Sequence, residues 1–355
     1  MGTVAIARGA DPRAIPTLDA EIRKALDDAP LKLLFKGTTS ADLRDWQKEF
    51  GGLIRKFLGP HTPPVRWKAR RLATETFADH SREEWLLEAD KTMSLPLYLL
   101  RPTELKFGKG PHPLVLCLHG HGPYGHDAVA GVDETPERAQ NIKGANYDYA
   151  RQLAREGFVT VAPCLLPFGR RLEESYANSK TDACAVTFVR LMLLGQTLMG
   201  SNLRDCRWAL DWATRQPGVT RDRIGCVGLS YGGRMTMVVS ALDERIRCCV
   251  ISGALNVMQE RARGRYSCGA QVIPNLLQHG DTPEIGSLIA PRPCIWEIGS
   301  KDGLIVPGWR EKAITRLERA YAASGQPDNL LIHRFEGGHR WDGVTALPML
   351  KRVLS

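Results

Sequence analysis

The sequence around Ser230 constrains the fold more than any other part of the chain. A short apolar run ends at Gly228, passes through a serine flanked by glycines, and resumes as a helix-compatible run over 234–241. Gly-x-Ser-x-Gly at such a junction is typical of a strained strand-to-helix turn that lifts the serine hydroxyl clear of the sheet. Gly228 and Gly232 lack the Cβ that would collide inside this turn. The bare pentapeptide also arises by chance, but the strand and helix patterns beside it favour the strained turn.

A serine hydroxyl is a poor nucleophile at neutral pH, so the turn implies catalysis only if a base and an orienting acid follow it. A buried-strand pattern over 293–299 precedes Asp302, and a last strand pattern over 330–335 precedes His339. In α/β sheets, sites are built at the carboxyl ends of strands. The order Ser, Asp, His, each just after a strand, predicts a catalytic triad of Ser230, Asp302 and His339. Glu297 is the nearby alternative acid, but it lies in mid-strand.

A second loop is predicted to complete the site. The continuous apolar run over 113–118 is typical of a parallel strand buried on both faces, and it ends in His119-Gly120-His121-Gly122. In sites built around a serine turn of this kind, the loop after the corresponding strand donates one backbone N–H to the oxyanion of the intermediate. The residue after the nucleophile donates the other. We therefore expect the oxyanion hole to consist of the backbone N–H groups of His121 and Tyr231. The side chains of His119 and His121 are expected to brace the loop or each other.

Metal and cofactor sites are not predicted. A metal site would have to use residues of one loop that has no matching carboxylate motif, namely His119, His121, His126 and Asp127. The nine cysteines are scattered, without the C-x-x-C spacing of zinc sites, and no glycine-rich nucleotide-binding motif follows a strand. We expect no metal and no cofactor.

Composition and charge bear on partners and compartment. Of the 355 residues, 43% are hydrophobic and 25% charged, and no run approaches the roughly eighteen apolar residues of a membrane span. No secretory signal is visible and the cysteines fit reduced thiols, so we expect a soluble cytoplasmic protein without a membrane partner. The net charge is +9, but the 48 basic residues are interleaved with 39 acids, so we expect no nucleic-acid partner. The positive charge would favour anionic substrates by steering.

The chain order predicts an α/β fold with one catalytic domain over 63–355, preceded by a helical extension and linker over 1–62. Helical spacing over 18–34 and 40–57 predicts two helices packed against the core, with Ser40 as N-cap and an interruption at Gly51-Gly52. Strand patterns over 65–77, 84–89 and 95–101 predict an antiparallel edge. The later alternation of strands and helices predicts a mostly parallel central sheet flanked by helices.

Two insertions follow strand ends, at about 164–200 and 253–291, and are expected to line a substrate pocket. The second contains a cluster of polar residues: Arg261, Arg263, Arg265, Tyr266 and Asp281. The arginines are a candidate substrate anchor, although a solvated surface is the interpretation that we favour.

Four motifs together resemble the α/β-hydrolase superfamily, and more narrowly its dienelactone-hydrolase and acetyl-xylan-esterase-like branch. They are the serine turn, the His-Gly-His-Gly loop, Leu288-Ile289-Ala290-Pro291-Arg292-Pro293 and Gly337-Gly338-His339-Arg340. The resemblance covers roughly residues 66–355 and implies the triad given above. True dienelactone hydrolases have a cysteine nucleophile, so the serine of this chain shifts the expectation toward esterases. The oxyanion loop also departs from the family pattern, because it continues as Pro123-Tyr124-Gly125-His126 instead of a glycine run.

We therefore expect a serine hydrolase that cleaves small-molecule carboxylic esters through an acyl-enzyme. One alternative is an oligopeptidase-type serine peptidase or amidase, although about sixty N-terminal residues are too few for the large extra domain of such enzymes. Another is a catalytically silent hydrolase-fold binding protein, against which the complete triad argues. Homo-oligomer formation stays open.

Overall fold

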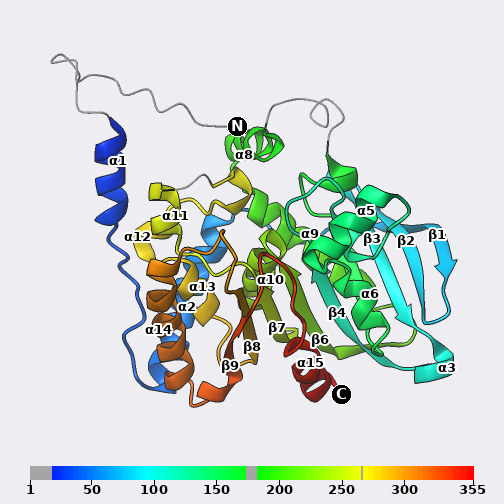
Figure 1. Cartoon of the computed structure of the whole chain (residues 1–355). Helices are drawn as coiled ribbons and strands as arrows, with labels where there is room; N and C mark the ends of the chain where they lie inside the picture. The colour runs from blue at the N-terminus through cyan, green and yellow to red at the C-terminus, as the bar shows by residue number, and fades with distance from the viewer. Residues whose placement is uncertain (1–17, 173–181, 265–266) are drawn as a thin grey trace.

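The computed structural model describes residues 18–172, 182–264 and 267–355, and the strands in these ranges form one nine-stranded sheet (Figure 1). The order across the sheet is β1-β2-β3-β5-β4-β6-β7-β8-β9. Helices cover both faces of the sheet, which gives three layers. The predicted α/β class with a central sheet flanked by helices is confirmed.

The first three strands form an antiparallel edge. β1 (Lys68–Thr76), β2 (His80–Ala89) and β3 (Thr92–Pro102) pair in sequence order, and β3 pairs antiparallel with β5 (Val159–Pro163). Every residue of β1 is exposed, as befits the outermost strand. The antiparallel edge expected from the sequence is confirmed.

The other strands run parallel and set the position of the site. They are β4 (His112–Leu118), β5, β6 (Val219–Leu229), β7 (Ile246–Ser252), β8 (Cys294–Gly299) and β9 (Leu330–Phe335). β5 and β8 are buried along their whole length, because both faces of a parallel sheet are covered. The carboxyl ends of these strands meet at one edge, so the loops that follow β4, β6, β7, β8 and β9 lie together.

The alternation of side chains along β4 divides the core into two clusters. Leu114 and Leu116 belong to one cluster, and Val115 and Cys117 to the other. The first cluster joins the sheet to α2 (Ser40–Phe57), α9 (Leu198–Ala213), α10 (Tyr231–Leu242), α13 (Thr282–Ser287) and α14 (Pro307–Ala323). The second joins it to α4 (His126–Val129), α6 (Tyr149–Ala154) and α15 (Ala346–Leu354).

The two N-terminal helices differ in detail from the prediction. α1 ends at Asp27 instead of residue 34, since Pro30 has no N–H to continue the helix and disfavours helical backbone in the residue before it. The N-cap of α2 is Thr39, not Ser40, because Thr39 and Asp42 form a reciprocal capping box. α2 runs through Gly51-Gly52 without a break and packs into the first cluster of the core.

The two insertions contribute further helical segments. The first contains α8 (Ala183–Leu193), and the second contains α11 (Met258–Gly264), η2 (Gly269–Gln271) and α12 (Leu276–His279). α8 packs against η2, so the two insertions touch. The other described elements are α3 (Glu104–Phe107), α5 (Pro136–Ala145), η1 (Gly169–Arg171) and η3 (Pro327–Asn329). No helix of the described ranges is by itself long and apolar enough to cross a membrane, and the α8–α9 pair, bent by 90°, passes that test only by length and composition.

Candidate active site

Ser230 occupies a strained turn between β6 and α10. Its φ of 64° and ψ of −121° lie in a region that a residue with a side chain rarely adopts. The glycines make the turn possible: a Cβ on Gly232 would lie 1.8 Å from the carbonyl oxygen of Leu118, and one on Gly228 would lie 2.4 Å from the carbonyl oxygen of Gly232. The backbone N–H of Ser230 donates to the carbonyl of Ser252 at 2.9 Å, which ties the turn to β7.

His339 and Asp302 form a hydrogen-bonded pair on the neighbouring loops. His339 Nδ1 lies 2.8 Å from Asp302 Oδ2, and the Asp302 side chain is buried. The other carboxylate oxygen, Oδ1, accepts the backbone N–H of Leu304 at 2.9 Å, so the acid is held at both oxygens. A carboxylate on Nδ1 selects the tautomer in which that nitrogen carries the proton, and Nε2 is then free to accept one.

Gly253 brings the loop after β7 against the imidazole of His339. A Cβ on Gly253 would lie 2.8 Å from His339 Cε1 and 3.1 Å from Leu229 Cδ1, next to the serine turn. Gly253 also has a φ of 57°, which glycine adopts without strain. The loops after β6, β7, β8 and β9 therefore converge around Ser230, Asp302 and His339.

The loop after β4 packs directly against the serine turn. A Cβ on Gly120 would lie 2.9 Å from Ser230 Cβ, so this backbone touches the turn. Two tyrosines of the segment before and within α6 fix the loop, because the Gly120 N–H donates to the Tyr147 hydroxyl at 2.6 Å and the Tyr149 hydroxyl donates to the Leu118 carbonyl. The predicted oxyanion residues His121 and Tyr231 both line the same pocket as Ser230.

The His119 side chain braces this loop, as expected. It is fully buried, with Nδ1 2.8 Å from the Gly120 carbonyl oxygen and Nε2 accepting the Leu165 N–H at 2.8 Å. Burial lowers the pKa of His119 to about 4, so the ring is neutral at physiological pH. A neutral imidazole with one donor and one acceptor suits both of these contacts.

The structure does not gather the loop residues that the sequence singled out as the metal-site alternative. His119 serves the backbone, His126 is buried against Tyr98, and Asp127 pairs with Arg138 at 3.0 Å. Within the described ranges, the cluster that offers soft metal ligands is instead His121, Cys184 and Cys268, whose ligand atoms all lie within 4.8 Å of one another.

This cluster is a hydrogen-bonded group. His121 Nε2 lies 2.9 Å from Cys268 Sγ, and hydrogen bonds from Cys184 and His121 lower the pKa of the Cys268 thiol. A thiolate and an imidazole suit a soft cation such as Zn²⁺, although only three such ligands come together here. The cluster joins the oxyanion loop to both insertions.

The alternative acid, Glu297, has a different role. Its buried carboxylate accepts the backbone N–H groups of Gly343 at 2.9 Å and Asp342 at 3.2 Å, and burial raises its pKa. Glu297 therefore anchors the chain that follows His339, while Asp302 is the acid that is bonded to the imidazole.

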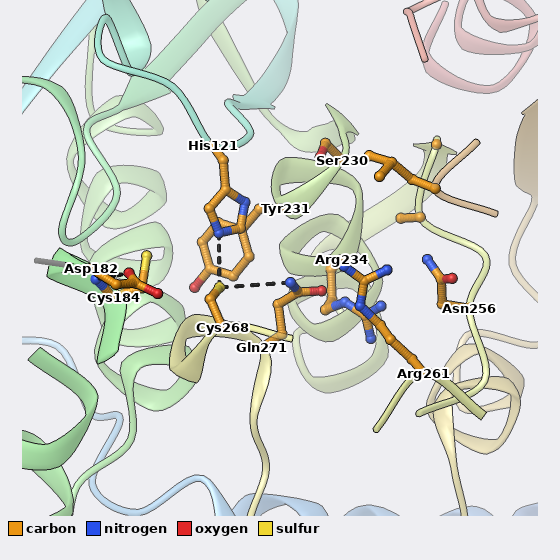
Figure 2. Close-up of a pocket in the computed structure, with 13 residues that line it drawn as sticks. His121, Asp182, Cys184, Ser230, Tyr231, Arg234, Asn256, Arg261, Cys268 and Gln271 are labelled. Carbon is orange, nitrogen blue, oxygen red and sulfur yellow. Dashed lines mark hydrogen bonds between the residues drawn. The ribbon is translucent and has the colours of Figure 1, made fainter. Parts of the chain in front are cut away.

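A pocket of about 270 Å³ opens beside Ser230 (Figure 2). Residues of both insertions line it: Cys184 comes from the first, and Arg261 and Cys268 come from the second. Arg263 turns away, with its guanidinium 3.2 Å from the Asp27 carboxylate of α1. Arg265 and Tyr266 lie outside the described residues.

Sequence reasoning missed several residues that shape the site. Tyr147 and Tyr149 sit at the start of a helical pattern and have no motif of their own. Gly253 could have been noticed in the sequence, because a glycine directly after a strand pattern indicates a close backbone approach or a positive φ. Arg234 follows the serine turn on α10 and lines the pocket, although the sequence suggested only a helical position for it.

Comparisons with known proteins agree with this architecture. The model of the Abhydrolase family matches residues 3–343. A Bacillus subtilis (strain 168) protein named "Putative hydrolase YtaP" is 30% identical over 282 residues, which span 76% of this chain and 88% of that protein.

Two solved structures are similar in fold. One, from Bacteroides fragilis NCTC 9343, is described as a "putative acetyl xylan esterase"; it has a TM-score of 0.76 at 22% identity over 91% of this chain and 83% of that one. The other is a glucuronoyl esterase from Solibacter usitatus, with a TM-score of 0.66 at 14% identity over 92% of this chain and 98% of that one. The resemblance noted from the motifs is thus confirmed, and the chain belongs to the Abhydrolase family and has the α/β-hydrolase fold.

Proposed function

We propose that the protein hydrolyses carboxylic esters of small molecules with Ser230 as the nucleophile. The observation that carries this proposal is a strained serine turn beside a pocket, with the hydrogen-bonded His339–Asp302 pair next to it, as the close approach of Gly253 to both His339 and Leu229 indicates. A turn of this geometry costs conformational energy, and such strain is retained chiefly at functional sites.

In the proposed acylation step, Ser230 Oγ attacks the ester carbonyl carbon while His339 Nε2 takes the hydroxyl proton. Asp302 holds the imidazole in the required tautomer and stabilises the imidazolium that forms. The tetrahedral intermediate then collapses, the bond to the leaving oxygen breaks, and His339 gives its proton to that oxygen, which departs as the alcohol. Water attacks the resulting acyl-enzyme by the same sequence and releases the acid.

The oxyanion of each intermediate would be held by the backbone N–H groups of His121 and Tyr231. Tyr231 is the first residue of α10, and the N–H groups of a first helical turn have no acceptor within the helix. His121 follows Gly120, which packs against Ser230. The contacts of Tyr147, Tyr149 and His119 support this role, since they fix the loop before substrate arrives.

A substrate panel tests the proposal. Turnover of p-nitrophenyl esters of increasing acyl length, of an acetylated sugar and of a peptide amide should be compared in wild type and Ser230→Ala. We expect ester turnover that falls by at least about a thousandfold in Ser230→Ala. Ser201→Ala, which alters a buried serine of α9, is the matched control and should keep the wild-type rate.

Two results would contradict the proposal. Faster cleavage of the peptide amide than of any ester would make the protein a peptidase. Turnover of none of these substrates, together with no labelling by a fluorophosphonate, would indicate a silent binding protein.

A further inference from the structure

The pocket beside Ser230 contains a buried arginine that the proposed ester chemistry does not use. Arg234 lies one turn into α10 and is only 4% exposed, yet it lines the pocket (Figure 2). Its guanidinium donates a long hydrogen bond of 3.4 Å from Nη1 to Thr282 Oγ1. Within the ranges that the structure describes, no carboxylate lies within 4.0 Å of this guanidinium. A buried cation without a close counter-charge is costly.

A second arginine, from the second insertion, raises this cost. Arg261 of α11 lines the same pocket. Burial lowers the pKa of Arg234 to about 10, and the positive charge of Arg261 acts in the same direction. Two like charges that face one cavity repel each other, so packing alone does not favour this arrangement.

The nearby acids are committed to other groups. Asp281 partly offsets the charge of Arg234, but its carboxylate is fully buried and accepts the N–H groups of Met258 at 2.7 Å and Gln259 at 2.9 Å. Asp182, on the far wall, caps α8 by accepting the N–H of Cys184 at 2.9 Å. These carboxylates stabilise helix ends and do not close an ion pair with Arg234.

Neutral amides complete the same wall. Asn256 and Gln271 line the pocket beside the two arginines. Gln271 is oriented by a contact of 3.7 Å from its Nε2 to Cys268 Sγ. Guanidinium groups bind carboxylate and phosphate oxygens through paired, charge-assisted hydrogen bonds, and side-chain amides add further donors.

We propose that Arg234 and Arg261 form an anion subsite, so that the preferred substrate is an ester that carries a second, anionic group such as a carboxylate. The inference rests on the proposed ester hydrolysis for its substrate class, but the subsite itself is defined by the arginines. The anionic group lies in the subsite while the ester carbonyl reaches Ser230 in the same pocket of about 270 Å³. Only a small acid would fit both positions.

Kinetics with a matched pair of esters test the substrate class. The mono-p-nitrophenyl ester of succinic acid carries a carboxylate, and p-nitrophenyl butyrate is its neutral counterpart of similar length. We expect wild-type kcat/KM to favour the anionic ester by about tenfold or more, since a hydrogen bond to a charged group is worth at least that factor. Arg234→Met and Arg261→Met should each remove most of this preference.

Arg263→Met is the matched control, because Arg263 belongs to the same helix but pairs with Asp27. It should keep the wild-type preference. Arg261 is less buried than Arg234, so Arg261→Met keeps the test valid if Arg234→Met does not fold.

A binding measurement separates this proposal from the proposed activity. Ser230→Ala should be titrated calorimetrically with succinate, with inorganic phosphate and with neutral succinamide. Binding of either anion, lost in the double variants with Arg234→Met or Arg261→Met, would support the subsite even if no ester were turned over. The anion that binds more tightly, succinate or phosphate, would show whether the subsite prefers a carboxylate or a phosphate group.

The change in Tm distinguishes a substrate-binding arginine from a merely structural one. Removal of a buried charge that Asp281 offsets only in part should leave the Tm of Arg234→Met equal to or above that of wild type. A lower Tm with an unchanged preference for the anionic ester would assign a structural role and overturn the proposal. Active enzyme with no preference between the two esters, and no anion binding, would also overturn it.

Discussion

The imidazole Nδ1 of His339 lies 2.8 Å from the buried carboxylate of Asp302, although 36 residues separate them in the sequence. The parallel sheet makes this contact possible, because β8 and β9 are neighbours and deliver both residues to the same edge. The backbone of Gly253 also lies against this imidazole, since a Cβ there would be 2.8 Å from His339 Cε1.

Replacement of Asp302 by asparagine should lower kcat for ester turnover by roughly 10⁴-fold, since an amide can neither select the Nδ1–H tautomer nor stabilise the imidazolium. Steady-state kinetics at saturating substrate measure the effect. Glu297→Gln is the matched control on the same segment: it loses one acceptor for backbone N–H groups and should cost about 1–3 kcal/mol of stability while the chemistry persists. A crippled Glu297→Gln beside a nearly active Asp302→Asn would show that the acid is wrongly assigned.

Gly253→Ala should impair catalysis more than folding. The new Cβ would lie 2.8 Å from His339 Cε1, so the imidazole must move, and a displacement of about 1 Å can cost on the order of a hundredfold in kcat. Gly52→Ala is the control, because nothing lies within 4 Å of its new Cβ and alanine should stabilise α2 by up to about 1 kcal/mol. Wild-type kcat in Gly253→Ala would mean that the imidazole does not need its observed position.

Acid should destabilise the protein through His119. The folded-state pKa is about 4, below the ordinary imidazole value of about 6.5, so the unfolded chain binds more protons between these values. Stability is therefore highest above pH 6.5 and falls as the pH drops toward 4, by on the order of 3 kcal/mol from this group. Urea unfolding across this range measures the slope.

His119→Gln is the comparison for that slope. Glutamine offers a donor to Gly120 and an acceptor to Leu165 but does not titrate. The free energy of unfolding of this variant should therefore fall less steeply between about pH 6.5 and 4 than that of wild type. Equal slopes of unfolding free energy against pH in the two proteins would exclude His119 as a cause of acid sensitivity.

Exhaustive dialysis against a chelator should leave ester turnover unchanged, since every proposed step uses a side chain or a backbone N–H of this chain. The rate is measured before and after dialysis and after addition of Zn²⁺. A loss of activity that Zn²⁺ restores would contradict the triad mechanism and direct attention to His121, Cys184 and Cys268.

Sequence patterns predicted the local features that depend on neighbouring residues. The turn at Ser230 is one, since Gly228 and Gly232 reveal its steric demands directly. The buried strands are another, because apolar runs such as 113–118 are a consequence of burial on both faces. The exact cap of α2 was missed because Thr39 and Ser40 are both good caps, and only the reciprocal bonds with Asp42 distinguish them.

Contacts between distant segments could not be predicted in this way. The hydrogen bond from His121 to Cys268 joins residues 147 positions apart, and neither residue carries a local signal for it. The same holds for Arg234 and Arg261, whose shared pocket depends on how the second insertion folds over α10. The two glycines predicted an interruption of α2 at Gly51-Gly52, but the helix continues through them. Gly51 is buried where α2 packs against Leu288, and this tertiary packing outweighs the low helix propensity of glycine.

The central claim is that Ser230 is the nucleophile, and covalent labelling tests it most directly. The intact wild-type protein is treated with a fluorophosphonate, and the adduct is located by peptide mass spectrometry alongside Ser230→Ala and Asp302→Asn. We predict one adduct per chain on Ser230, none in Ser230→Ala, and much slower labelling in Asp302→Asn. Stoichiometric labelling of Ser230→Ala, or an adduct on another residue of the wild-type chain, would contradict the account.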